Sequence, residues 1–137
     1  MFTKQGRIDE AIIYYSEALR INPRYADAHS NLGLALKNQG EIKDAISHFS
    51  EALRINSGHA EANDNMGLIL ENEGRVDEAM SYYFRALEHN PDFADAYNSI
   101  GNALIRQGKI EAAVKNLSIA LRKNPEFAEA EYNMDED

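Results

Sequence analysis

The fold is decided by residues 26–93, which read ADAHSNLGLALKNQGEIKDAISHFSEALRINSGH and then AEANDNMGLILENEGRVDEAMSYYFRALEHNPDF. The second string repeats the pattern of the first after 34 residues. Small residues recur along the chain with the same spacing, at Gly33, Gly67 and Gly101 and at Ala45, Ala79 and Ala113. A fixed period of this size is typical of a solenoid, in which each unit buries its apolar face against its neighbours.

Each period predicts two amphipathic helices, at about Ala26–Gln39 and Glu41–Ile55 in the first complete copy. Apolar residues return there at steps of three and four, which is helical spacing. Gly40 allows a sharp turn between the two helices. Asn-Pro pairs ending in Pro91 and Pro125 terminate the second helix of a period, because proline disfavours helix in the residue before it. The sequence therefore predicts an all-α protein.

The small residues predict where the two helices of one period approach. Gly33 on the first helix and Ala45 on the second would face each other, and a larger side chain at either place would hold the backbones apart. Later periods place Gly67 and Gly101, with Ala79 and Ala113, at the same points.

These residues resemble the tetratricopeptide repeat family over essentially the whole chain. The repeats begin at Ala26, Ala60 and Ala94. The family's small eighth position then falls on the three glycines, its alanine at the twentieth on the three alanines, and its aromatic at the twenty-fourth on Phe49 and Tyr83, with Leu117 a departure. Ser57 replaces the proline, so we expect the loosest junction there. The resemblance implies a right-handed superhelical solenoid of antiparallel helix hairpins.

The period divides the chain into five segments. Residues 26–59, 60–93 and 94–127 are complete repeats. Residues 1–25 supply the second helix of a partial repeat, and residues 128–137 supply the start of a further repeat with an acidic tail. We expect a piece of a longer array.

In this family the first helices of successive repeats line a concave groove, so the resemblance implies which side chains face a peptide. Those positions hold acids at Asp27, Glu61, Asp64 and Asp95, and amides or a hydroxyl at Asn31, Asn65, Ser99, Asn133, Asn38, Asn72 and Asn102. An asparagine side chain donates and accepts at once, which suits it to holding an extended peptide backbone. These asparagines at equivalent positions of successive repeats resemble the asparagine ladder in the repeat region of O-linked N-acetylglucosamine transferases.

The same positions indicate the charge of the partner. Some family members bind acidic C-terminal tails with a clamp of basic residues, and those basic positions are occupied here by Ser30, Asp64, Asp95 and Ser99. Lys37 and Arg106 are the cations that we expect to face the groove. An acidic groove favours a neutral or basic extended peptide, with an attraction that salt weakens.

Composition excludes several classes of function. A net charge of −9 argues against binding to nucleic acid. No apolar run approaches the roughly 20 residues that cross a bilayer. The chain has no cysteine and its start lacks the layout of a secretory signal, so we expect a cytoplasmic location and no thiolate metal site.

The chain also lacks the usual motifs of catalysis. It has neither a phosphate-binding glycine loop nor a nucleophile elbow. Histidines occupy four different positions of the period, which indicates ordinary surface or packing residues: His29, His48, His59 and His89. We therefore expect no enzyme, no cofactor and no metal.

Three functions fit the sequence. The first is a scaffold that binds an extended peptide in the groove. The second is the substrate-recognition arm of a larger enzyme such as a glycosyltransferase. The third is a self-assembling module that forms head-to-tail homo-oligomers, because regular open ends give contacts that do not close.

Overall fold

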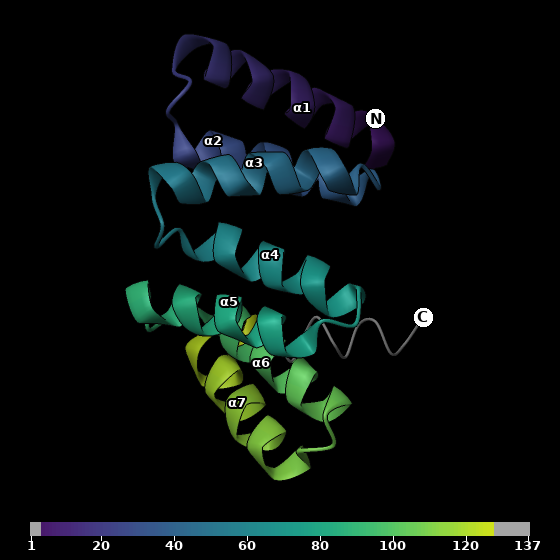
Figure 1. The fold of residues 1–137 in the computed structure, drawn as a ribbon, viewed down its shortest axis with the longest axis vertical. Coiled ribbons are helices and arrows are strands. Elements are labelled where there is room, and N and C mark those ends of the chain that lie inside the picture. Colours follow the sequence, from purple (N-terminus) through teal and green to yellow (C-terminus); the bar gives the residue numbers. More distant parts are fainter. Residues whose placement is uncertain (1–3, 128–137) are drawn as a thin grey trace.

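The structure, a computed structural model, describes residues 4–127 and there consists of seven helices stacked in chain order (Figure 1). The helices are α1 (Lys4–Ile21), α2 (Ala26–Asn38), α3 (Ile42–Ile55), α4 (Ala60–Asn72), α5 (Val76–His89), α6 (Ala94–Arg106) and α7 (Ile110–Lys123). Three hairpins, α2–α3, α4–α5 and α6–α7, pack one on the next. The predicted all-α solenoid of antiparallel hairpins is confirmed.

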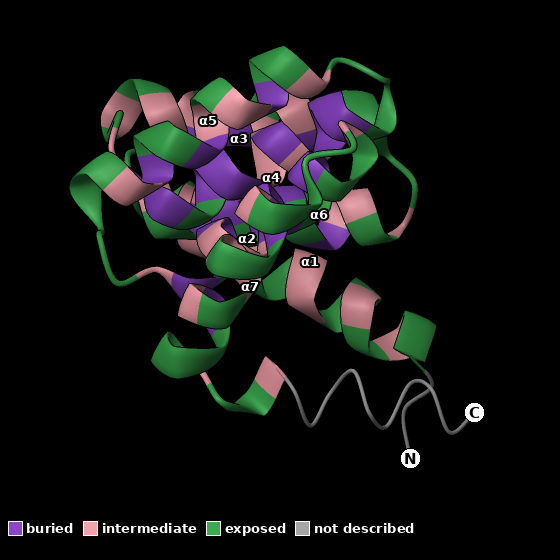
Figure 2. Cartoon of the chain, turned by 90° about the horizontal axis from the view of Figure 1, so that it is seen from below, coloured by how far each residue is buried: buried purple, intermediate pink, exposed green. Residues whose placement is uncertain are grey.

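Six of the seven described helices pair into hairpins. Each of the units 26–59, 60–93 and 94–127 contains one hairpin, and α1 lies in the segment 1–25. Among the described residues α1 packs only against α2, and none of its residues is buried (Figure 2). Residues 128–137, where we expect a further helix, lie outside the described residues.

Each hairpin turn depends on a glycine in the left-handed backbone region. Gly40 has a φ of 85°, and Gly74 and Gly108 repeat this conformation. The Gly40 N–H donates to the Lys37 carbonyl and the Glu41 N–H donates to the Leu36 carbonyl, both at 2.9 Å. This pair of bonds satisfies carbonyls that the end of α2 leaves without helical partners. The predicted sharp turn is confirmed.

The two helices of a hairpin are held together by a large side chain seated on a glycine. A Cβ added to Gly33 would lie 2.8 Å from the Phe49 ring, and one added to Gly67 would lie 2.4 Å from the Tyr83 ring. Phe49 and Tyr83 are both 0% exposed. The small eighth position therefore makes room for the side chain at the twenty-fourth position, rather than only letting two backbones approach.

The junctions between repeats share one backbone conformation. Asn56, before Ser57, has φ −140° and ψ 95°, and Asn90, before Pro91, has φ −140° and ψ 83°. Proline is therefore not needed to form this junction. Residues at the fourth position of a repeat bond to this junction: the Asn63 amide donates to the Ser57 carbonyl at 3.1 Å, and the Tyr97 hydroxyl donates to the Pro91 carbonyl at 3.2 Å.

The substitution Gly67→Ala tests the seat of the Tyr83 ring. Alanine favours a helix by about 1 kcal/mol over glycine, but overpacking a filled core costs about 1–3 kcal/mol. Because the Tyr83 ring is buried and its hydroxyl donates to Glu71 at 2.8 Å, the ring has little room to move. We expect urea denaturation to show a net loss of stability of about 1 kcal/mol.

The control makes Gly67→Ala in a chain that already carries Tyr83→Ala. With the ring removed, Gly67→Ala should cost nothing or stabilise the chain. An equal cost in both backgrounds would show that the ring is not the obstacle.

Candidate functional site

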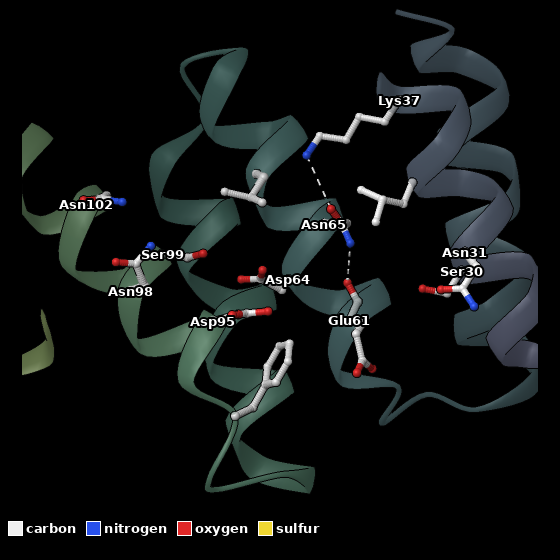
Figure 3. A pocket seen from close by; sticks show the side chains of 13 residues that line it. Ser30, Asn31, Lys37, Glu61, Asp64, Asn65, Asp95, Asn98, Ser99 and Asn102 are labelled. Atoms are coloured by element: carbon white, nitrogen blue, oxygen red, sulfur yellow. Dashed lines mark hydrogen bonds between the residues drawn. The ribbon is translucent and has the colours of Figure 1, made fainter. Parts of the chain in front are cut away.

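A groove of about 390 Å³ runs along the face formed by α2, α4 and α6 (Figure 3). Its lining comprises Ser30, Asn31, Leu34, Lys37, Glu61, Asp64, Asn65, Leu68, Phe93, Asp95, Asn98, Ser99 and Asn102. All of them except Phe93 belong to the first helices of the three repeats. The second helices pack behind these first helices, so the stack leaves one face of each first helix open to a ligand.

The structure brings most of the expected site residues together in this groove. They are Asn31, Glu61, Asp64, Asn65, Asp95, Ser99 and Asn102. Asp27 lines a smaller hollow beside it, and Asn38 lines a separate hollow between α1 and α2. Asn72 is exposed and does not line the groove. Asn133 lies outside the described residues.

Several lining residues were not among the expected ones. Asn98 holds the fifth position of its repeat, and Leu34 and Leu68 hold the ninth, so the family pattern that selected Asp64 and Asn102 could have found them. Phe93 precedes α6 and has no signal in that pattern.

The asparagines of the groove differ in how much of their bonding capacity is free. Asn65 donates to the Glu61 carbonyl at 2.9 Å and accepts from the Lys37 ammonium at 3.4 Å. Within residues 4–127, no hydrogen bond engages the side-chain amides of Asn31, Asn98 or Asn102, so these three can both donate to and accept from a ligand. The side-chain amide of Asn65 already makes hydrogen bonds within the protein.

Two acids of the first helices, Glu71 and the expected groove residue Asp27, are engaged within the protein. The Glu71 carboxylate accepts from the Tyr83 hydroxyl at 2.8 Å and pairs with Arg106 at 3.2 Å. Burial and this bond to the carboxylate raise the pKa of Tyr83. Arg106, expected to face the groove, is thus paired with Glu71 and does not line it.

Asp27 is engaged by His59, whose ring also caps α4. His59 Nδ1 accepts from the Ala62 N–H at 3.2 Å, and Nε2 lies 2.7 Å from the Asp27 carboxylate. Because Nδ1 accepts, a neutral ring carries its hydrogen on Nε2 and donates it to Asp27. Glu61, 3.6 Å from Nδ1, therefore faces a lone pair and makes no ion pair with a neutral His59.

Asp64 is the least compensated acid of the groove. It is 6% exposed, and its Oδ1 has no hydrogen-bond partner among the described residues. The pKa of Asp64 is raised to about 6, chiefly by burial and also by the charge of Asp95, while a hydrogen bond from the Ser99 hydroxyl acts to lower it. Burial, and then Glu61, also raise the pKa of Asp95.

Lys37 is the cation that lines the groove among the described residues. Burial lowers the pKa of Lys37, and Asp64 partly restores it. No ion pair within 4 Å joins Lys37 to an acid in residues 4–127, because its ammonium donates to Asn65 instead (Figure 3). Glu61, Asp64 and Asp95 are therefore left as a group of carboxylates with one cation near them.

Two histidines, His29 and His48, meet across the first hairpin. Nδ1 of His29 lies 3.1 Å from Nδ1 of His48, and the rings stack with centroids 5.4 Å apart. Burial, and then His29, lower the pKa of His48. The pair forms because the antiparallel hairpin brings the fourth position of one helix opposite the twenty-third position on the other.

Comparison with protein families finds tetratricopeptide repeats along the chain. A family described as TPR repeat matches residues 1–40, and families described as tetratricopeptide repeat match residues 26–59 and 70–134. The comparison with curated proteins gives no match.

Comparison with solved structures finds similar stacks. The crystal structure of MamA is 30% identical with a TM-score of 0.71, and the match covers 90% of this chain and 72% of that one. A second MamA crystal structure is 30% identical with a TM-score of 0.68, over 89% of this chain and 67% of that one. A structure from the functional characterisation of pilF of Pseudomonas aeruginosa is 26% identical with a TM-score of 0.76, over 89% of this chain and 56% of that one.

Two features are absent from the part of the chain that the structure describes. No helix between residues 4 and 127 has both the length and the apolar character needed to span a bilayer. Over the same residues, no three acidic or histidine side chains are grouped as ligands for a metal ion.

The substitution Asp64→Asn tests the burial of this carboxylate. The folded-state pKa of about 6 lies above the ordinary value of 3.8, so the folded chain loses stability as pH rises from about 4 through 6. Above that range the variant should be more stable than the native chain by on the order of 2–3 kcal/mol. Thermal unfolding should show this gain at neutral pH and little gain near pH 4.

The control is Glu88→Gln, which removes an exposed charge outside the groove. It should change stability little at either pH. A gain for Asp64→Asn that is the same at both pH values would contradict the assigned burial.

Proposed function

The chain belongs to the tetratricopeptide repeat family, and from this premise we propose that it binds an extended peptide segment of a partner protein in the groove of α2, α4 and α6. Repeats of this kind are protein-interaction scaffolds, and a scaffold role needs no chemistry in the repeats themselves. The peptide bound by this groove is neutral or basic.

The observation that carries the proposal is the set of unengaged amides along the groove. Asn31 on α2 and Asn98 and Asn102 on α6 line one continuous groove, and none of the described hydrogen bonds uses their side chains. A peptide backbone presents alternating donors and acceptors, and each amide can pair with both. Such pairing holds a backbone without selecting its side chains.

The apolar residues of the lining give the groove a second kind of contact. Leu34 lines the groove and is 39% exposed, and Leu68 and Phe93 are partly buried. Bound side chains that cover these residues remove apolar surface from water, which contributes about 25 cal/mol per Å². Amides and apolar residues together fit an extended polypeptide better than a small polar ligand.

The test is an array of blocked peptides probed with the native chain and with Asn31→Ala/Asn98→Ala. Each lost hydrogen bond is worth about 1 kcal/mol, so losing one bond at each asparagine should weaken peptide binding about thirtyfold. Fluorescence polarisation with the selected peptides measures this ratio.

Asn72→Ala is the matched control, because Asn72 is an exposed asparagine of α4 that does not line the groove. It should leave the affinity unchanged. If the double variant binds as tightly as the native chain, the peptide lies elsewhere and the proposal fails.

A further inference from the structure

The starting observation is the place of Asp64 in the helix. Glu61 and Asp95 lie in the first turns of α4 and α6, where a carboxylate interacts favourably with the helix N-terminus. Asp64 lies beyond the first turn of α4, so the helix N-terminus does not stabilise its carboxylate in this way. Asp64 is 6% exposed, it lines the groove, and its Oδ1 has no partner in residues 4–127.

A carboxylate in this position destabilises the free chain. Burial disfavours its charged form, and no ion pair within residues 4–127 compensates it. The titratable groups that interact with Asp64 are Lys37 from α2, Asp95 from α6, Tyr83 from α5, and Glu71 on its own helix. Glu71 is already neutralised by Arg106, as described above. Lys37 donates to Asn65, so within residues 4–127 neither Asp64 nor Asp95 forms an ion pair with a cation.

The surroundings indicate what kind of cation fits. No metal-ligand group of three is present among the described residues, which favours an organic cation. Phe93 and Leu68 line the same groove, and they can cover the methylene stem of a long basic side chain. Figure 3 shows Asp64 and Asp95 facing the groove from α4 and α6, with Ser99 beside Asp64.

We propose that Asp64 and Asp95 form a subsite for one basic side chain, lysine or arginine, of the peptide held in the groove. This inference rests on the function proposed above and names the residue that the groove selects. The cation compensates the buried carboxylate, so ligand binding removes a cost that the free chain carries. The attraction weakens with salt.

Ionisation of Asp64 links this binding to pH. With a pKa of about 6 in the free chain, Asp64 is partly protonated at mildly acidic pH, and the basic side chain binds its charged form. The affinity for a basic peptide should therefore rise as pH increases through about 6. The charges of Lys37, Glu71 and Asp95 also affect the pKa of Asp64.

The experiment compares blocked peptides in one extended host sequence, acetyl-Ser-Thr-Ala-Xaa-Ala-Thr-Ser-amide, with lysine, arginine or norleucine at Xaa. Norleucine keeps the apolar stem of lysine without its charge. For the native chain, titration calorimetry should give the basic peptides an affinity about tenfold above that of the norleucine peptide. The double variant Asp64→Asn/Asp95→Asn should lose this difference.

The control is Glu10→Gln/Glu88→Gln, which removes the same number of charges from exposed residues of α1 and α5 outside the groove. It should keep the difference. Asp64→Asn is expected to stabilise the fold, so a loss in the first variant reports on the subsite and not on unfolding.

The outcomes separate the two proposals. If all three peptides bind the native chain equally, or if the double variant keeps the preference for a basic residue, the subsite is overturned while the groove function stands. If no peptide of the series or of the array binds the native chain, the groove function fails and the subsite fails with it.

Discussion

The whole stack depends on one packing contact, repeated in each hairpin: a large side chain of the second helix seated on a glycine of the first. Phe49 sits on Gly33 and Tyr83 sits on Gly67, each ring fully buried. Cores of this density tolerate neither a gap nor an added methyl group without loss of stability. The contact fixes how the two helices of a repeat face each other, and therefore which side of the first helix stays free.

The free sides of α2, α4 and α6 become the groove, and their polar residues divide into two groups. Glu71 and Asp27 are matched by Arg106 and His59, so they contribute to the fold. Asp64 is buried without a matching cation and destabilises the folded chain. A residue that destabilises an otherwise well-packed structure is usually found at a functional site.

The period of the sequence was enough to predict the helices, the turns at Gly40 and its equivalents, and the hairpin stack. The pattern of the first helices also predicted much of the groove lining. It could not predict which acids are already paired, because the partner of Glu71 lies on a different repeat and its distance depends on how the hairpins stack. Nor did it predict that His29 meets His48, because contact between two side chains at the edge of a hairpin depends on how its helices pack.

A crystal structure of the chain with a bound lysine-containing peptide would test peptide binding in the groove most directly. We predict an extended peptide along α2, α4 and α6, with its backbone paired to Asn31 and Asn98. The lysine ammonium should lie within hydrogen-bonding distance of Asp64 or Asp95. A peptide bound to the outer face of α3, α5 and α7, or one whose lysine points away from both carboxylates, would contradict this prediction.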